Sequence, residues 1–309
     1  MKMKKINFVF LIVVISVLIF SCEYYSYGLE EFLYRSNTVS VRAEEMPDLS
    51  GKNGNSEDLE IFNKVSGKKY TVLFITDVHF GGENSGKNGA RPELLFLEWL
   101  KNLKETNPEL YPSFAICLGD IAEHGHDREF IEYKFFTDKL NTAEYGSIKT
   151  FNVVGNHDLY NSGWEGFKKF CYPYTSFYKF RTKGFTWYFV DSASCSIGED
   201  QLTTLSRDMI YNEKGRKKLV FTHVPVYANG VQYFVMQNTT ERNRFISLLA
   251  DENTSMLVDG HTHAENKSDL GFIEWNLPGF LEKYGFGLMF VDETNPLNPT
   301  AQMKVFYLK

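Results

Sequence analysis

The sequence has little cysteine and no surplus of basic residues. Four of its 309 residues are cysteine, and 33 Lys and Arg stand against 39 Asp and Glu. The net charge of −6 becomes −9 without residues 1–21, because 30 basic residues then face the same 39 acids. Such a chain has no general attraction to nucleic acid backbones, so we expect no nucleic-acid-binding surface. A phosphate substrate would need cations that are bound locally.

The cysteines also exclude a disulfide framework. Cys22 lies near the N-terminus, and the three that follow it are an odd number. A bridge between Cys171 and Cys195 stays open, because the sequence does not give their distance.

The N-terminus has the layout of an export signal. Three lysines precede an apolar run at residues 6–20, which is short for a membrane-spanning helix. Residues 18–22, which end at Cys22, resemble the lipobox of bacterial lipoproteins, in which the cysteine is acylated and becomes the mature N-terminus. We therefore expect a lipoprotein signal peptide at residues 1–21 and a lipid-anchored protein of the cell envelope, periplasmic or surface-facing. The alternative is a membrane anchor that is never cleaved.

The rest of the chain divides into a linker and one domain. Residues 22–67 are polar and irregular, as in a tether. From Lys69 onward, short apolar runs alternate with segments of helical period, which predicts an α/β domain with mixed sheets over residues 68–309. The predicted strands are 70–76, 114–118, 150–154, 187–190, 219–222 and 255–258, and the predicted helices are 93–105, 127–140, 200–211 and 241–250.

Polar residues of metal-ligand type follow five of the predicted strands. The carboxyl ends of strands are where sites assemble in α/β proteins, and all seven histidines lie in or beside these segments. Each motif alone is explained as well by a turn or a cap, but their joint occurrence favours a site. Carboxylate, imidazole and amide donors suit Mn, Fe or Zn better than Ca or Mg. The residues are Asp77, His79, Asp120, Asn156, His157, Asp158, His223, His261 and His263.

In this order, the motifs resemble the calcineurin-like metallophosphoesterases over residues 70 to about 265. They are Asp77-x-His79, Gly119-Asp120, Gly155-Asn156-His157-Asp158, His223 and Gly260-His261-x-His263. The resemblance implies two mixed β-sheets packed as a sandwich and flanked by helices. It implies one metal ion on Asp77, His79 and His263, a second on Asn156, His223 and His261, and Asp120 as the bridge. It also implies that His157 faces the substrate while Asp158 orients its ring.

The activity implied is attack by a metal-bridging hydroxide on a phosphomonoester or phosphodiester, with two divalent transition-metal ions, Mn first and Fe or Zn next. The chain is most similar to small single-domain bacterial members. Arg91, His124 and His126 are candidate substrate contacts, although solvated loops explain them as well. Residues 227–238 form either a pocket wall or part of the core.

Several alternatives remain open at this level. One is a pyrophosphate or phospholipid hydrolase of the same fold, since a membrane tether brings lipid head groups close. Another is a surface lipoprotein that binds metal or a ligand without catalysis. The sequence also leaves the oligomeric state open.

Overall fold

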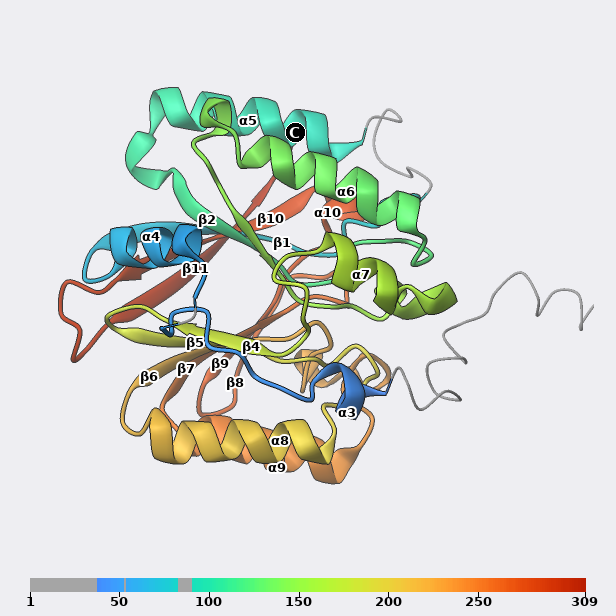
Figure 1. The fold of residues 1–309 in the computed structure, drawn as a ribbon, viewed down its shortest axis with the longest axis vertical. Coiled ribbons are helices and arrows are strands. Elements are labelled where there is room, and N and C mark those ends of the chain that lie inside the picture. Colours follow the sequence, from blue (N-terminus) through green and yellow to red (C-terminus); the bar gives the residue numbers. More distant parts are fainter. Residues whose placement is uncertain (1–37, 53, 83–90) are drawn as a thin grey trace, which may run out of the picture.

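The computed structural model describes residues 38–52, 54–82 and 91–309. Their strands form two sheets, and helices cover the outer face of each sheet (Figure 1). The strands are β1 Lys69–Ile75, β2 Pro112–Cys117, β3 Thr150–Asn152, β4 Tyr178–Arg181, β5 Phe185–Phe189, β6 Lys217–Phe221, β7 Thr254–Asp259, β8 Asn266–Asp269, β9 Ile273–Asn276, β10 Gly285–Asp292 and β11 Thr300–Tyr307. The helices are α3 Val39–Arg42, α4 Ser56–Val65, α5 Pro92–Thr106, α6 Asp127–Leu140, α7 Trp164–Phe170, α8 Glu199–Arg207, α9 Thr239–Asp251 and α10 Phe280–Lys283.

Both sheets are mixed, and each contains a set of adjacent parallel strands. The five-stranded sheet has the order β11-β10-β1-β2-β3, in which β1, β2 and β3 are parallel. The six-stranded sheet has the order β4-β5-β6-β7-β9-β8, and β5, β6, β7 and β9 are parallel. The predicted sandwich of two mixed sheets flanked by helices is confirmed.

Three apolar layers hold this arrangement together, and β1 shows how one strand serves two of them. Leu73 and Ile75 pack under the helices α5 and α6, whereas Val72 and Phe74 pack between the two sheets. A strand that is buried on both faces has to be apolar throughout, which explains the unbroken run in the sequence. The third layer lies between the six-stranded sheet and the helices α8 and α9.

The predicted tether is wrong for its described part. Phe62 on α4 is buried in the layer between the sheets, and its ring stacks on Phe180 with centroids 4.2 Å apart. Arg42 on α3 forms a buried ion pair with Asp191, with Nε 2.8 Å from Oδ2. The packed domain therefore begins by Thr38 and not at residue 68. Because this segment is mostly polar, its sequence did not indicate the few contacts through which it packs on the rest of the domain.

Two further expectations concern the cysteines and the membrane. Cys117, Cys171 and Cys195 form no disulfide with one another in this structure, so the bridge between Cys171 and Cys195 is absent. Cys22 and the predicted signal peptide lie outside the described residues. Of the described helices, none combines the length and apolar composition that a bilayer crossing requires.

Candidate metal centre

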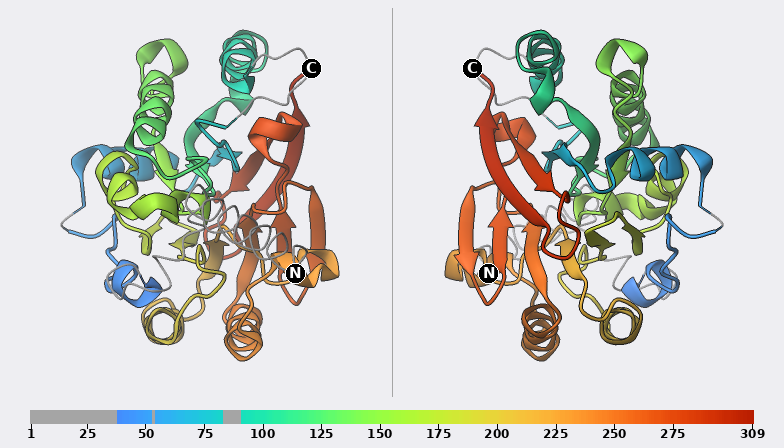
Figure 2. Two further views of the ribbon diagram at one scale, coloured as in Figure 1. Left: turned by 90° about the vertical axis from the view of Figure 1, so that its right-hand side faces the viewer. Right: turned by 90° about the vertical axis from the view of Figure 1, so that its left-hand side faces the viewer.

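The central strands of both sheets deliver their following loops to one side of the molecule (Figure 1; Figure 2, left). Asp77 follows β1, Asp120 follows β2, His223 follows β6 and Gly260 follows β7. Backbone hydrogen bonds join these loops: the amide of Asp77 donates to the carbonyl of Gly119 at 3.0 Å, and the amide of Gly260 donates to that of His223 at 3.0 Å. Ligand-type side chains from separate strands are thereby brought together.

A first group of four predicted ligands has donor atoms within 4.8 Å of one another. It consists of Asp77, His79, Asp120 and His263. His263 Nε2 lies 3.2 Å from Asp77 Oδ1 and 3.3 Å from His79 Nε2. His79 Nε2 lies 3.9 Å from Asp120 Oδ2.

A second group shares Asp120 with the first. It contains Asp120, His223 and His261. His223 Nε2 lies 3.3 Å from Asp120 Oδ2 and 3.0 Å from the amide oxygen of Asn156. Since the same oxygen of Asp120 faces both His79 and His223, this carboxylate has the position of a shared ligand.

The donor set in both groups fits divalent cations. Three ring Nδ1 atoms lie within 3.1 Å of oxygens outside the groups, and that of His223 donates a hydrogen bond, so the Nε2 atoms are directed inward. Lone pairs and carboxylate oxygens that converge at about 3 Å repel one another unless metal cations or protons lie among them. The outer contacts are His79 to Glu123 Oε2 at 2.8 Å, His263 to Glu282 Oε2 at 3.1 Å and His223 to the Leu118 carbonyl at 2.8 Å.

Without cations, protons balance the buried carboxylates. Burial lowers the pKa of His263, but the carboxylate of Asp77 outweighs this effect and raises the pKa to about 10. Burial also lowers the pKa of His223, and Asp120 outweighs it to raise that pKa to about 9. The pKa of His261 falls to about 4, because burial and the proximity of His223 both act against its charge. A cation that binds here has to displace the protons of His223 and His263.

The chain matches the sequence model of one protein family. The model of the calcineurin-like phosphoesterases matches residues 70–265, which is most of the chain and contains every residue of the two groups. The chain belongs to the calcineurin-like phosphoesterase family. It is accordingly a metal-dependent hydrolase of phosphoric esters, and its two groups of ligands fit the divalent ions of that chemistry.

Solved structures share the fold at low sequence identity. A dimetal phosphatase from Danio rerio has a TM-score of 0.55 and 15% identity, over 78% of this chain and 99% of that one. A protein assigned as a 5′-nucleotidase from Staphylococcus aureus has a TM-score of 0.52 and 13% identity, over 78% of this chain and 54% of that one. A 5′-nucleotidase from Candida albicans has a TM-score of 0.50 and 11% identity, over 77% and 52%. This chain therefore matches about half the length of the two nucleotidases. Among curated proteins, none matches it.

The backbone of the phosphoesterase site is strained at several of the predicted ligands. Five predicted ligands have positive φ angles, which are uncommon for residues with a Cβ and typical of functional sites. Their φ angles are 53° for Asp77, 43° for His79, 49° for Asp120, 65° for His261 and 52° for His263. The loops also approach closely, because a Cβ on Gly155 would lie 2.3 Å from Asp120 Oδ1.

His157 lies in the site, but the predicted role of Asp158 is wrong. The ring of His157 packs edge-on against His79 with centroids 4.7 Å apart, and its Nδ1 donates to the carbonyl of Glu123 at 2.8 Å. Asp158 is fully buried and accepts from three backbone amides instead of the ring, so it holds the loops that follow β2 and β3. These amides, each at 2.8 Å, belong to Ile121, Ala122 and Gly155. Burial and the neighbouring Asp120 raise the pKa of Asp158 to about 7.

Sequence reasoning missed two carboxylates around the phosphoesterase site. Glu123 contacts His79 and lies 3.9 Å from His157 Nδ1, so it links a predicted ligand to the residue that is predicted to face the substrate. Its place three residues after Asp120 was the available signal. Glu282 contacts His263 from α10, and no local pattern marks it.

The three candidate substrate contacts are engaged with other protein groups. The guanidinium of Arg91 pairs with Glu93, with Nη2 2.7 Å from Oε1. The backbone amides of His124 and His126 donate to the carboxylate of Glu129 at 2.9 and 3.1 Å. Glu129 thus fixes the loop that carries both histidines, and their contact with a substrate stays a prediction.

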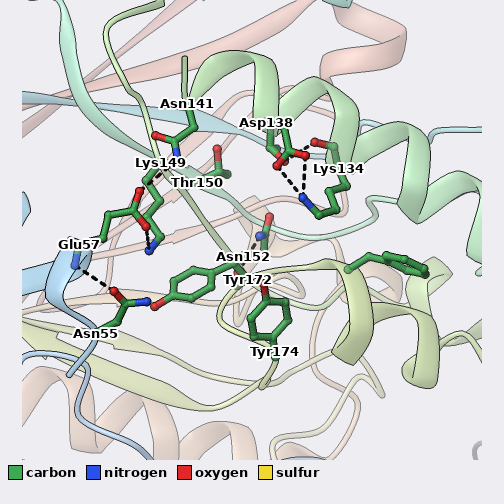
Figure 3. A pocket seen from close by; sticks show the side chains of 12 residues that line it. Asn55, Glu57, Lys134, Asp138, Asn141, Lys149, Thr150, Asn152, Tyr172 and Tyr174 are labelled. Carbon is green, nitrogen blue, oxygen red and sulfur yellow. Dashed lines mark hydrogen bonds and ion pairs between the residues drawn. The ribbon is translucent and has the colours of Figure 1, made fainter. Parts of the chain in front are cut away.

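A separate polar cavity of about 250 Å³ lies along the edge strand β3 (Figure 3). Its charged side chains pair with one another: Lys149 lies 2.7 Å from Glu57, and Lys134 lies 2.6 Å from Asp138. Tyr172 forms another part of the wall. The lining residues include none of the predicted ligands, so this cavity is distinct from the metal centre.

Proposed function

We propose that the protein hydrolyses a phosphomonoester or a phosphodiester with two divalent metal ions. The observation that carries this proposal is the position of Asp120 in both groups of ligands. Because one oxygen of Asp120 faces both groups, this carboxylate is suited to join two ions.

The chain supplies a distinct set of donors for each ion. When bound, the ions would lower the pKa of a water molecule and neutralise charge that develops on the phosphoryl oxygens. With Asp120 shared, one ion would be held by Asp77, His79 and His263 and the other by Asn156, His223 and His261. Oxygen and imidazole donors without thiolate favour Mn, with Fe or Zn as the next candidates.

His157 would act on the substrate and not on the metal. Its Nδ1 donates a hydrogen bond to the carbonyl of Glu123, so Nε2 is the atom that can exchange a proton. In its protonated form, the ring would stabilise negative charge on the phosphoryl group and donate a proton to the leaving oxygen.

The test uses the chain from residue 23, purified without chelator and supplied with Mn. We expect turnover of p-nitrophenyl phosphate or bis-p-nitrophenyl phosphate, and the preferred ester separates a monoesterase from a diesterase. Asp120→Asn should lose both metal and activity, whereas His157→Ala should lose activity and retain metal. Two bound ions without turnover of either ester would contradict the proposal and direct the search to pyrophosphate, phospholipid vesicles or a non-catalytic binding role.

We further propose that the protein works outside the cytoplasm, tethered by a lipid on Cys22. The basic start, the short apolar run and the position of Cys22 support this. Labelling with a radioactive fatty acid, with and without globomycin, tests it: the labelled chain should shift to the unprocessed size when the inhibitor is present. An unlabelled full-length chain would support the uncleaved anchor instead.

A further inference from the structure

The segment between His223 and α9 is uncharged and exposes apolar side chains. Residues 224–238 contain no Asp, Glu, Lys or Arg. Tyr233 is 91% exposed and Phe234 is 48% exposed, and Tyr227 and Val231 are exposed as well. A cluster of exposed apolar side chains on one short segment is typical of a binding surface, whereas isolated ones are not.

This segment lies beside the metal centre. The ring of Phe234 stands edge-on to His261, with centroids 6.0 Å apart, and His261 in turn lies 5.1 Å from His223. Phe234 therefore borders the second group of ligands, and the other exposed side chains belong to the same segment.

A buried carboxylate holds the beginning of the segment. Glu274 on β9 is fully buried and accepts from three consecutive backbone amides: Val226 at 2.8 Å, Tyr227 at 2.9 Å and Ala228 at 3.1 Å. Several amide donors on one carboxylate form strong charge-assisted hydrogen bonds, which restrain the backbone.

The far end of the segment is held as well. The amide of Met236 donates to the carbonyl of Pro225 at 3.0 Å, and the amide of Gln237 donates to that of Cys195 at 2.8 Å. Since both ends are fixed, the exposed side chains between them are presented at the edge of the site in a defined position.

We infer that residues 224–238 form an aromatic wall, which binds a flat aromatic group of the substrate next to the phosphorus. This inference rests on the proposed phosphoester hydrolysis and names the class of ester. Three of the four exposed apolar side chains are aromatic, and aromatic rings stack on planar groups. A second phosphate would need cations, but this wall has none, and Arg91 is paired with Glu93. Glu274 is the positioning residue of the wall.

Two pairs of esters test the wall. For a diesterase, the full chain is assayed on p-nitrophenyl phenyl phosphate and p-nitrophenyl methyl phosphate, which share the p-nitrophenol leaving group. For a monoesterase, it is assayed on 1-naphthyl phosphate and glycerol 1-phosphate, whose leaving groups differ, so each variant is compared with the unsubstituted protein on the same ester. Phe234→Ala should lower kcat/KM on the aromatic ester by about ten-fold, the effect of one lost stacked ring. It should have a much smaller effect on the aliphatic ester. Equal effects on both esters would overturn the inference.

Two further variants provide controls. One tests whether the flat ring of Phe234 matters beyond its apolar volume, and the other tests whether loss of any exposed aromatic side chain lowers activity. Phe234→Leu keeps an apolar side chain but no flat ring, so it should behave like Phe234→Ala; full activity of the Leu variant on the aromatic ester would contradict an aromatic wall. Tyr211 is also exposed but lies before β6, at the opposite end of the strand from His223. Tyr211→Ala is therefore the matched control, and it should change neither ester.

Glu274→Gln tests the positioning role. A glutamine side chain has one acceptor oxygen, so at least one of the three amides loses its partner. We expect a higher KM for the aromatic ester, unchanged kcat on the aliphatic ester, and faster hydrogen exchange at residues 226–228. Combined with Phe234→Ala, the two losses should be less than additive, since both remove the same contact. Additive losses, or equal losses on both esters, would show a merely structural role.

Ligand binding provides a readout that does not depend on turnover. Calorimetry on the Mn-loaded full chain should show tighter binding of phenylphosphonate than of methylphosphonate, and Phe234→Ala should remove the difference. This result would support the wall even if no ester is hydrolysed, in which case only the proposed function fails. Equal binding of the two phosphonates, or a preference for phospholipid vesicles over every soluble aromatic ester, would overturn the inference.

Discussion

Manganese should bind much more weakly at pH 6 than at pH 8, because protons compete with it for two histidines. In the metal-free protein, the pKa of His223 is raised to about 9 by Asp120, against the opposing effect of burial. The pKa of His263 is raised in the same way to about 10, chiefly by Asp77. Both rings are therefore protonated between pH 6 and pH 8, and the two Mn ions have to displace one proton each.

The size of the pH effect on the Kd for Mn follows from the number of displaced protons. A raised pKa means that the folded protein holds the proton more tightly than free imidazole does, so affinity for metal rises with pH until about pH 9. Each displaced proton changes the apparent Kd about ten-fold per pH unit. Each ion displaces one of the two protons, so over two pH units its Kd changes about 100-fold, and the product of the two Kd values changes about 10⁴-fold, or roughly 5 kcal/mol.

Calorimetry at pH 7 in two buffers of different ionisation enthalpy counts the protons directly, and competition with a coloured chelator gives the Kd at each pH. Full occupancy of both groups should release about two protons or more. His126→Ala is the control, because His126 belongs to neither group of ligands and the slope should not change. A Kd that stays constant between pH 6 and pH 8, or release of less than one proton, would refute the reasoning.

Three other substitutions test separate parts of the structure. Glu123→Gln should reduce kcat/KM and metal affinity by about 10- to 100-fold, since it removes the contact that orients His79; wild-type values would show that this contact has no role. His157→Ala should lower kcat by about 10²- to 10⁴-fold with metal content unchanged, and loss of metal would make His157 a ligand. Phe62→Ala on α4 should lower the free energy of unfolding by about 3–5 kcal/mol in urea denaturation, whereas the exposed Phe135→Ala should have little effect. Equal free energies of unfolding for these two variants would instead support a tether at residues 54–67.

Much of the fold was predictable because its signals are local. The alternation of apolar runs and helical periods places strands and helices within a few residues, and α6 has the predicted bounds of 127–140. The docking of α3 and α4 was not predictable. It depends on Phe62 meeting Phe180 and on Arg42 meeting Asp191, which are pairs far apart in the chain.

The metal centre, like the fold, was predictable from the sequence only in part. The sequence by itself determined the ligand types and their places after five strands, because each motif spans only a few residues at a strand end. Only the tertiary structure decided that the same oxygen of Asp120 faces both groups, that Asp158 binds backbone amides and not a ring, and that Glu282 orients His263. The aromatic wall is also a tertiary feature, because the carboxylate of Glu274 that holds it comes from another strand. The physical reason is that hydrogen bonds and charge pairs between distant segments depend on how the two sheets pack, and the periodicity of the sequence carries no record of that packing.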